Sequence, residues 1–147
     1  MPTMKKIDMP DFVPTQWDTS EDKKRFVQAF IRLVEGNFKE TLFPKWFYRR
    51  LSNCFGNIAH YNQYGFYEDQ LLTTARQCRF ISNCLNHPCY GDPRFTYSDV
   101  ERFLQTWIQE RGIADILLAR LNAETFAQDM SDLNILSTKH GFKLVRA

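Results

Sequence analysis

The sequence predicts a mainly α-helical protein that folds as a single compact domain of about five to six helices. The chain has 147 residues, a length at which one domain buries a core without disulfide or metal support. Apolar residues recur at helical spacing in several segments, which is the main sequence signal of amphipathic helices. Hydrophobic residues make up 44% of the chain and charged residues 24%, as in ordinary globular proteins. We expect an extended N-terminal arm over residues 1–17 and a helical domain over residues 18–147.

The N-terminal arm is expected to be extended because Pro2, Pro10 and Pro14 block a regular helix. Phe12 and Trp17 give this arm apolar side chains with which it can dock. An arm that carries such residues is expected to lie on the domain, where its apolar surface is removed from water.

The first two helices are predicted from their start signals. Asp18-Thr19-Ser20-Glu21 has the pattern of a capping box, and the apolar stripe that follows leaves Lys23 on the opposite, polar face. This helix ends near Gly36, because glycine commonly follows a helix end. The second helix starts near Pro44, which a first turn tolerates, and a connector follows over residues 58–65.

The second half of the chain is predicted to contain four more helices. The third covers residues 66–85, and the fourth begins with a capping box, Ser98-Asp99-Val100-Glu101. The fifth covers residues 113–121 and the sixth residues 123–132. Residues 134–145 can form a short C-terminal β-hairpin around a glycine turn.

The order helix, turn, helix, hairpin in the C-terminal third is that of a winged helix-turn-helix domain. The recognition helix would cover residues 123–132, which contain three acids and no base. Such a helix repels phosphate, so we do not expect this element to read DNA.

Aromatic residues are concentrated in residues 38–67, which hold ten of the 22 aromatic side chains in the chain. The same segment has no acid between Thr41 and Tyr67 but contains Lys45, Arg49 and Arg50. Such a segment is either the middle of a hydrophobic core or a surface that grips a partner, and the sequence leaves both interpretations open.

The candidate partner-binding residues share an aromatic or basic side chain in or beside the second predicted helix; they are Lys45, Trp46, Tyr48, Arg49, Arg50, His60 and Tyr61. Arginine and large aromatic residues dominate the binding energy of many interfaces. We therefore expect a non-enzymatic interaction protein, namely an adaptor, an inhibitor or an assembly subunit. Its partner is expected to be a protein or a protein–nucleic-acid complex.

Direct nucleic-acid binding through base stacking is the first alternative. The net charge of +2 argues weakly against it, because domains that bind nucleic acid by charge alone are usually more basic. A small zinc-stabilised domain is the second alternative, with Cys84, His87 and Cys89 as weak candidate ligands. Their spacing fits structural zinc sites poorly, so no metal or other cofactor is favoured.

Catalytic motifs are missing from the sequence. It contains no phosphate-binding glycine loop, no zinc-protease motif and no nucleophile elbow. Cys54 and His60 could act as a thiol and its base, but no family signature surrounds them. We therefore do not expect an enzyme.

The location expected from the sequence is the cytoplasm, with no membrane partner. No window approaches the ~20 apolar residues of a membrane-spanning helix, and no apolar run follows Lys5 and Lys6 as in a signal peptide. The four cysteines are then expected to be reduced.

Overall fold

The computed structural model describes residues 8–55, 58, 61, 63–86 and 91–140. Within these ranges the chain forms six α-helices and one short 3₁₀-helix and contains no strand. The elements in order are α1 (Ser20–Glu35), η1 (Glu40–Leu42), α2 (Lys45–Cys54), α3 (Phe66–Gln70), α4 (Thr74–Asn86), α5 (Ser98–Glu110) and α6 (Ile113–His140). The predicted mainly α-helical fold is confirmed.

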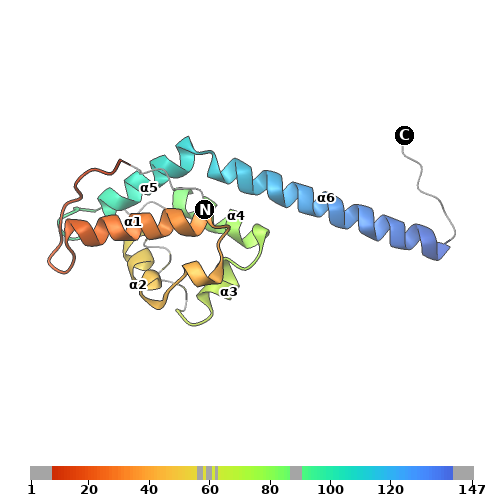
Figure 1. The fold of residues 1–147 in the computed structure, drawn as a ribbon, viewed down its shortest axis with the longest axis horizontal. Coiled ribbons are helices and arrows are strands. Elements are labelled where there is room, and N and C mark those ends of the chain that lie inside the picture. The colour runs from red at the N-terminus through yellow and green to blue at the C-terminus, as the bar shows by residue number, and fades with distance from the viewer. Residues whose placement is uncertain (1–7, 56–57, 59–60, 62, 87–90, 141–147) are drawn as a thin grey trace.

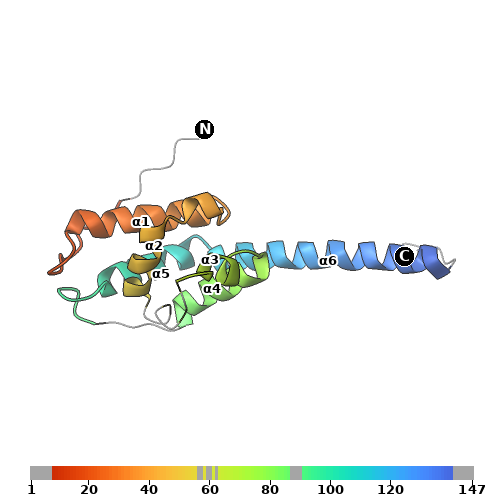
Figure 2. The same cartoon turned by 90° about the horizontal axis from the view of Figure 1, so that it is seen from below.

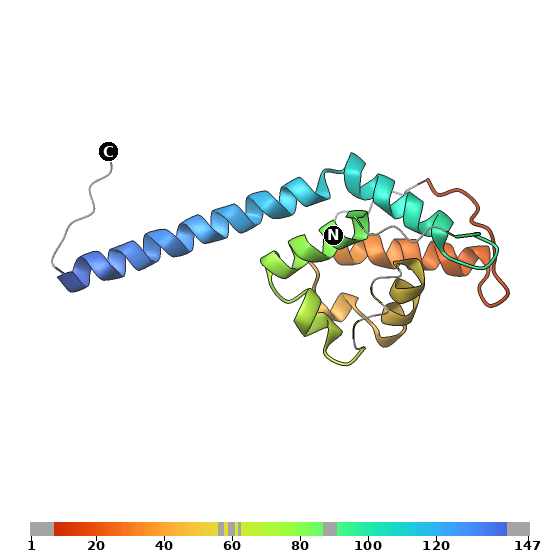
Figure 3. The same ribbon diagram turned by 180° about the vertical axis from the view of Figure 1, so that it is seen from behind.

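Helices α1 to α5 form a compact body, from which α6 projects (Figure 1). The first part of α6 packs against α4 and α5, and the rest extends away from the body (Figures 2 and 3). The loop of the N-terminal arm lies at the end of the body opposite to the tip of α6. The molecule is therefore elongated, with a globular end and a helical arm.

The aromatic segment over residues 38–67 supplies much of the hydrophobic core. Phe38, Phe47, Phe55 and Phe66 in this segment are at most 2% exposed. The ring of Phe47 stacks on Phe26 of α1, with 5.2 Å between the ring centroids. Buried aromatic pairs of this kind contribute more than their apolar area alone, so α1 and α2 are joined mainly through rings.

Helix α1 begins close to where the sequence indicates, but its capping box is formed by Thr19 and Asp22, one position beyond the predicted Asp18 and Glu21. The Thr19 side chain accepts a hydrogen bond from the Asp22 backbone N–H at 3.1 Å. In return, the Asp22 carboxylate accepts one from the Thr19 N–H at 2.9 Å, and this bond lowers the pKa of Asp22 below its usual value. Two backbone donors of the first turn are satisfied in this way.

The third predicted helix is wrong in one respect, because the chain forms two helices over residues 66–86. Helix α3 ends at Gln70 and α4 begins at Thr74. The Thr73 hydroxyl accepts a hydrogen bond from the Arg76 backbone N–H, and the Gln77 side chain donates to the Leu71 carbonyl at 3.0 Å. Side-chain bonds to the backbone compete with helix continuation in this way, so the break is satisfied locally.

The predicted break and hairpin at the C-terminal end are also wrong. One helix of 28 residues, α6, replaces the fifth and sixth predicted helices and includes residues 134–137, the first strand of the expected hairpin. The sequence has neither glycine nor proline between Gly112 and Gly141, so nothing in it ends the helix. The rest of the expected hairpin, over residues 141–147, lies outside the described residues. Residues 113–140 therefore do not have the winged helix-turn-helix order.

The predicted capping box at the start of α5 is wrong as well. Ser98 is the first residue of the helix, and the N-cap position belongs to Tyr97, whose side chain makes no capping hydrogen bond. The Ser98 hydroxyl donates instead to the Gly91 carbonyl at 2.6 Å. Asp99 accepts from the Lys23 ammonium at 2.9 Å and from the Val13 backbone N–H at 2.9 Å. The Asp99 carboxylate also accepts from the Val100 backbone N–H at 3.0 Å, so both side chains hold neighbouring segments, and Asp99 in addition bonds the first turn of its own helix.

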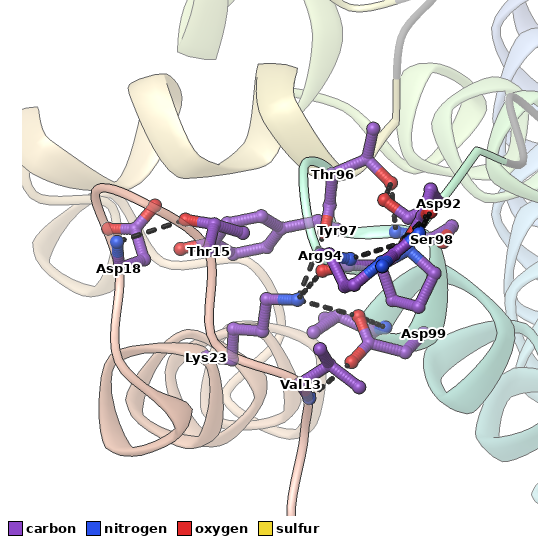
Figure 4. A network of polar contacts seen from close by, with 12 residues as sticks. Val13, Thr15, Asp18, Lys23, Asp92, Arg94, Thr96, Tyr97, Ser98 and Asp99 are labelled. Carbon is purple, nitrogen blue, oxygen red and sulfur yellow. Dashed lines mark hydrogen bonds and ion pairs between the residues drawn. The ribbon is translucent and has the colours of Figure 1, made fainter.

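Lys23 lies at the centre of the polar network in Figure 4 and is fully buried. Its ammonium group donates to the Pro93 and Thr96 carbonyls at 3.0 Å each, in addition to Asp99. Its expected place on the polar face of the first helix is wrong, because these three acceptors lie in the segment before and at the start of α5. Full hydrogen bonding of a buried charge is what makes its burial possible.

Residues 8–17 of the N-terminal arm lie along the body, through contacts that are both apolar and polar. Phe12 is buried against Phe103 of α5, with ring centroids 5.7 Å apart. The Val13 N–H is bound by Asp99, and Asp18 forms an ion pair with Arg50 at 2.6 Å. These contacts fix Phe12 and Val13 on α5 and Asp18 beside α2. Among the described residues, no helix has the length and apolar character needed to cross a membrane.

Candidate functional site

Helix α2 divides its side chains between the core and the surface. Phe47, Leu51 and Cys54 point inward and are buried. Other residues of α2 recur at the three- and four-residue spacing of one helix face; they are Trp46, Arg49, Arg50 and Asn53. Trp46 is 44% exposed. The outer face of α2 therefore combines an indole with two guanidinium groups.

A hollow of about 580 Å³ lies between this face of α2 and the end of the N-terminal arm. We call it the tryptophan hollow; it is lined by Trp17, Asp18, Trp46, Arg49, Arg50 and Asn53. Three of the candidate residues from the sequence, Trp46, Arg49 and Arg50, meet here. Its other wall comes from the arm, which sequence reasoning did not include in the site.

Trp17 is held outward by a tight turn over residues 15–18. The Thr15 hydroxyl accepts hydrogen bonds from the Trp17 and Asp18 backbone N–H groups at 3.2 and 3.0 Å, and the Thr15 N–H donates to the Asp18 carbonyl at 2.8 Å. The Trp17 side chain is 74% exposed, so the expectation that it docks on the domain is wrong. A threonine with an aspartate three positions on is a turn signal that could have suggested this presentation.

The two arginines of the tryptophan hollow have different roles. The Arg50 guanidinium binds Asp18 at 2.6 Å and donates to the Tyr97 hydroxyl at 2.7 Å, so it joins arm, α2 and α5. Burial raises the pKa of the Tyr97 phenol, against the lowering effect of that same hydrogen bond. Arg49 is exposed and forms no ion pair within the described part of the chain. Arg50 therefore builds the wall, whereas the Arg49 guanidinium is left exposed beside it.

Lys45 and Tyr48 lie on the other side of α2, at a second and smaller hollow of about 290 Å³. The Tyr48 hydroxyl donates to the Tyr61 carbonyl at 2.6 Å, which ties residue 61 to α2. Tyr64, also at this hollow, is 88% exposed. The candidate face is therefore split in two, and His60 lies outside the described residues.

The described cysteines have the environment of core residues. Cys54 and Cys84 are free thiols that are at most 2% exposed. Burial raises the pKa of both thiols, which keeps them protonated and makes Cys54 a poor nucleophile at neutral pH. Among the described residues no cluster of side chains could hold a metal ion. His87 and Cys89, the other weak zinc candidates, lie outside those residues.

No family model, curated protein or solved structure matches this chain. Its class is therefore defined by its own geometry. It is a helical domain with a docked N-terminal arm, an aromatic and basic hollow beside α2, and a projecting C-terminal helix.

Proposed function

We propose that this chain is a non-enzymatic interaction protein that binds a macromolecular partner through the tryptophan hollow. The observation that supports this function most directly is the pair of exposed indoles, Trp17 and Trp46, beside the exposed guanidinium of Arg49. Tryptophan and arginine are the residue types most enriched among the dominant contacts of protein interfaces. Free, buried thiols are typical of a reducing compartment such as the cytoplasm, where we expect the protein to act.

The hollow is preformed, which favours binding. The Thr15–Asp18 turn and the Asp18–Arg50 ion pair hold its arm side against α2. A partner therefore does not have to order Trp17 before it binds, and the entropic cost of association falls. Such a preformed anchor suits an adaptor, an inhibitor or an assembly subunit.

The charge of the site favours an acidic protein segment that also carries an apolar side chain. Helix α2 contains no acid, and the acids near the hollow, Asp18 and Asp22, already pair with Arg50 and Arg25. An incoming carboxylate would find Arg49, and the neighbouring apolar group would pack on the indoles.

Selection of peptides from a random display library on the purified protein tests this function. We expect acidic peptides with an aromatic or aliphatic residue to be enriched. Their affinity should fall about tenfold to thirtyfold for Trp46→Ala, as for a residue that dominates an interface. A charge reversal, Arg49→Glu, should weaken the same peptides. Leu72→Ala, which changes an exposed residue outside the hollow, is the matched control and should bind as the original chain does.

Oligonucleotide binding measured in the same buffers decides between a protein and a nucleic acid as the partner. A complex led by phosphate contacts weakens steeply as salt rises, whereas an apolar protein interface does not. Tight, salt-sensitive binding of single-stranded oligonucleotides without peptide enrichment would overturn the proposal in favour of base stacking. Enriched peptides that bind Trp46→Ala and Arg49→Glu unchanged would show that the hollow is not the site.

A further inference from the structure

Helix α6 carries apolar residues on all of its sides, with Ile116, Leu118 and Ile135 among those exposed. Two opposite faces differ in what they contact. One face packs on the body, where Leu117 is 3% exposed and the Glu124 carboxylate accepts a hydrogen bond from the Thr74 hydroxyl at 2.9 Å. The residues on the opposite face alternate in steps of four and three positions; they are Ala119, Ala123, Phe126, Met130, Leu133 and Ser137. We call this second set the seam.

The seam is uncovered in the distal half of α6. The distal half of α6 projects from the body (Figures 1 and 2). Of the seam residues there, Phe126 is 64% and Leu133 46% exposed, and Leu136, directly beside the seam, is 51% exposed. Contiguous exposed apolar residues mark interaction sites. A single helix of this length in water also gains little stability without packing of its apolar face. The distal half of α6 is therefore a docking surface.

The spacing of the seam identifies the kind of partner. Alternating steps of three and four residues are the repeat of a coiled coil, in which side chains of one helix fit between those of another. The partner is therefore a helix with a matching apolar stripe. We propose that this helix is α6 of a second copy of the chain, paired antiparallel with the first over residues 124–139.

Side-chain size supports an antiparallel register in which Met130 lies opposite Leu133 of the second copy. In that register the large Phe126 ring lies opposite the small Ser137 of the second copy, so large and small residues alternate across the pair. A parallel pair would place the two Phe126 rings against each other and would align the two helix dipoles unfavourably.

The charges beside the seam support the same register. Asp129 is the one charged residue directly beside the seam in the overlap, and it falls beside Leu136 of the second copy. A shift of one heptad toward the body would instead bring the two Asp129 carboxylates together, which is unfavourable. The seam positions from Ala123 to Ser137 are themselves uncharged, so pairing buries no isolated charge.

The free length of α6 matches this overlap. Residues 124–139 span about 23 Å at the rise of an α-helix. The antiparallel register places Glu124 of each copy level with Lys139 of the other. The second body then lies beyond the tip of the first α6, as the projecting shape in Figure 3 allows. Because α6 and the tryptophan hollow lie on different elements, this proposal stands independently of the proposed function.

The test is the molar mass of the full chain in solution, measured by sedimentation equilibrium over a wide concentration series. We expect a monomer–dimer equilibrium. Leu133→Asp places a charge in the seam and should weaken it about tenfold or more. Ile135→Asp is the matched control, because this exposed residue lies on the opposite side of the same turn. It should dimerise as the original chain does. Circular dichroism and the unfolding midpoint confirm that both variants fold.

Oxidative cross-linking checks the direction of the pair. A mixture of Phe126→Cys and Ser137→Cys should form a disulfide between the two variants, whereas Phe126→Cys alone should not link to itself. The original chain is the blank for its own cysteines. A monomer at every concentration, dimerisation that survives Leu133→Asp or is lost with Ile135→Asp, or self-linked Phe126→Cys would each overturn the proposed pair.

Discussion

At the scale of single residues, Lys23 is the clearest case of a side chain whose role the local sequence conceals. Its ammonium group is removed from water and has three acceptors, two of them backbone carbonyls. It also lies 5.2 Å from the centre of the Tyr97 ring. A buried cation contributes to stability only when all of its hydrogen-bond acceptors are in place. The contribution of Lys23 therefore depends on the whole junction between the arm, α1 and α5.

Replacing Lys23 with Met should destabilise the fold by about 3–5 kcal/mol, the usual cost of breaking a buried pair by removing one partner. Asp99 and the Pro93 and Thr96 carbonyls would lose their donor. The measurement is urea unfolding followed by circular dichroism. Lys24→Met is the matched control, because Lys24 pairs with the exposed Asp11. It should leave the midpoint within experimental error, and equal stability of both variants would contradict the role assigned to Lys23.

Sequence periodicity could not have found this lysine. Counting apolar residues around the first helix puts Lys23 on the polar face, and its neighbours Lys24 and Arg25 do lie at the surface. Its acceptors are 70 or more positions away in the chain. Only the fold brings them together, and no local rule encodes that distance.

At the scale of elements, two neighbouring hydroxyl groups at the N-terminus of α1 differ in their hydrogen bonding. Thr19 caps the helix and is reciprocated by Asp22. The Ser20 hydroxyl is buried and has no hydrogen-bond partner among the described residues. An unsatisfied buried hydroxyl costs stability, so removing the Thr19 hydroxyl should lower the free energy of unfolding, whereas removing the Ser20 hydroxyl should not.

Thr19→Ala should lower the free energy of unfolding by about 1 kcal/mol, the typical value of an N-cap side chain. Ser20→Ala should leave it unchanged or raise it, because the change removes an unpaired hydroxyl and alanine is the best helix former. Thermal unfolding of the two variants beside the original chain measures both effects. If Ser20→Ala is the more harmful of the two, the hydrogen bonding described for this cap is incorrect.

The accuracy of the predicted elements follows from how local their signals are. The starts of α1 and α2 were predicted to within one residue, because a capping motif and a proline act within one turn. The break between α3 and α4 depends on the Gln77 side chain bonding the Leu71 carbonyl six positions back. The two halves of α6 were predicted as separate helices, although no residue between them ends a helix.

At the scale of the whole molecule, the stability of the compact body is expected not to depend on the distal half of α6. A truncation after Thr125 should leave the unfolding midpoint of the body unchanged at low protein concentration, because the removed helix lies outside the body (Figure 1). Leu117→Ala is the contrasting variant and should cost about 2–5 kcal/mol, since Leu117 is buried. A large loss of stability in the truncated chain would show that the distal helix supports the core.

The candidate site was predicted in part. Trp46, Arg49 and Arg50 were singled out because aromatic and basic residues recur at helical spacing, and they do line one hollow. Trp17 was not included, because a residue in an extended arm has no periodicity that gives its direction. The segment over residues 38–67 belongs partly to the core and partly to the surface. Four of its phenylalanines are buried, while Trp46 and Tyr64 are exposed.

The tryptophan hollow involves the N-terminal arm, whose loop lies at the end of the body opposite to the tip of α6. Two copies paired through the distal halves of α6, as proposed above, would therefore carry their hollows at the two outer ends of one rod-shaped dimer. Such a rod is bivalent, and its second contact forms at a high effective concentration only where two target sites are spaced to match its length. The protein would then discriminate between partners by the distance between the two target sites that each partner presents.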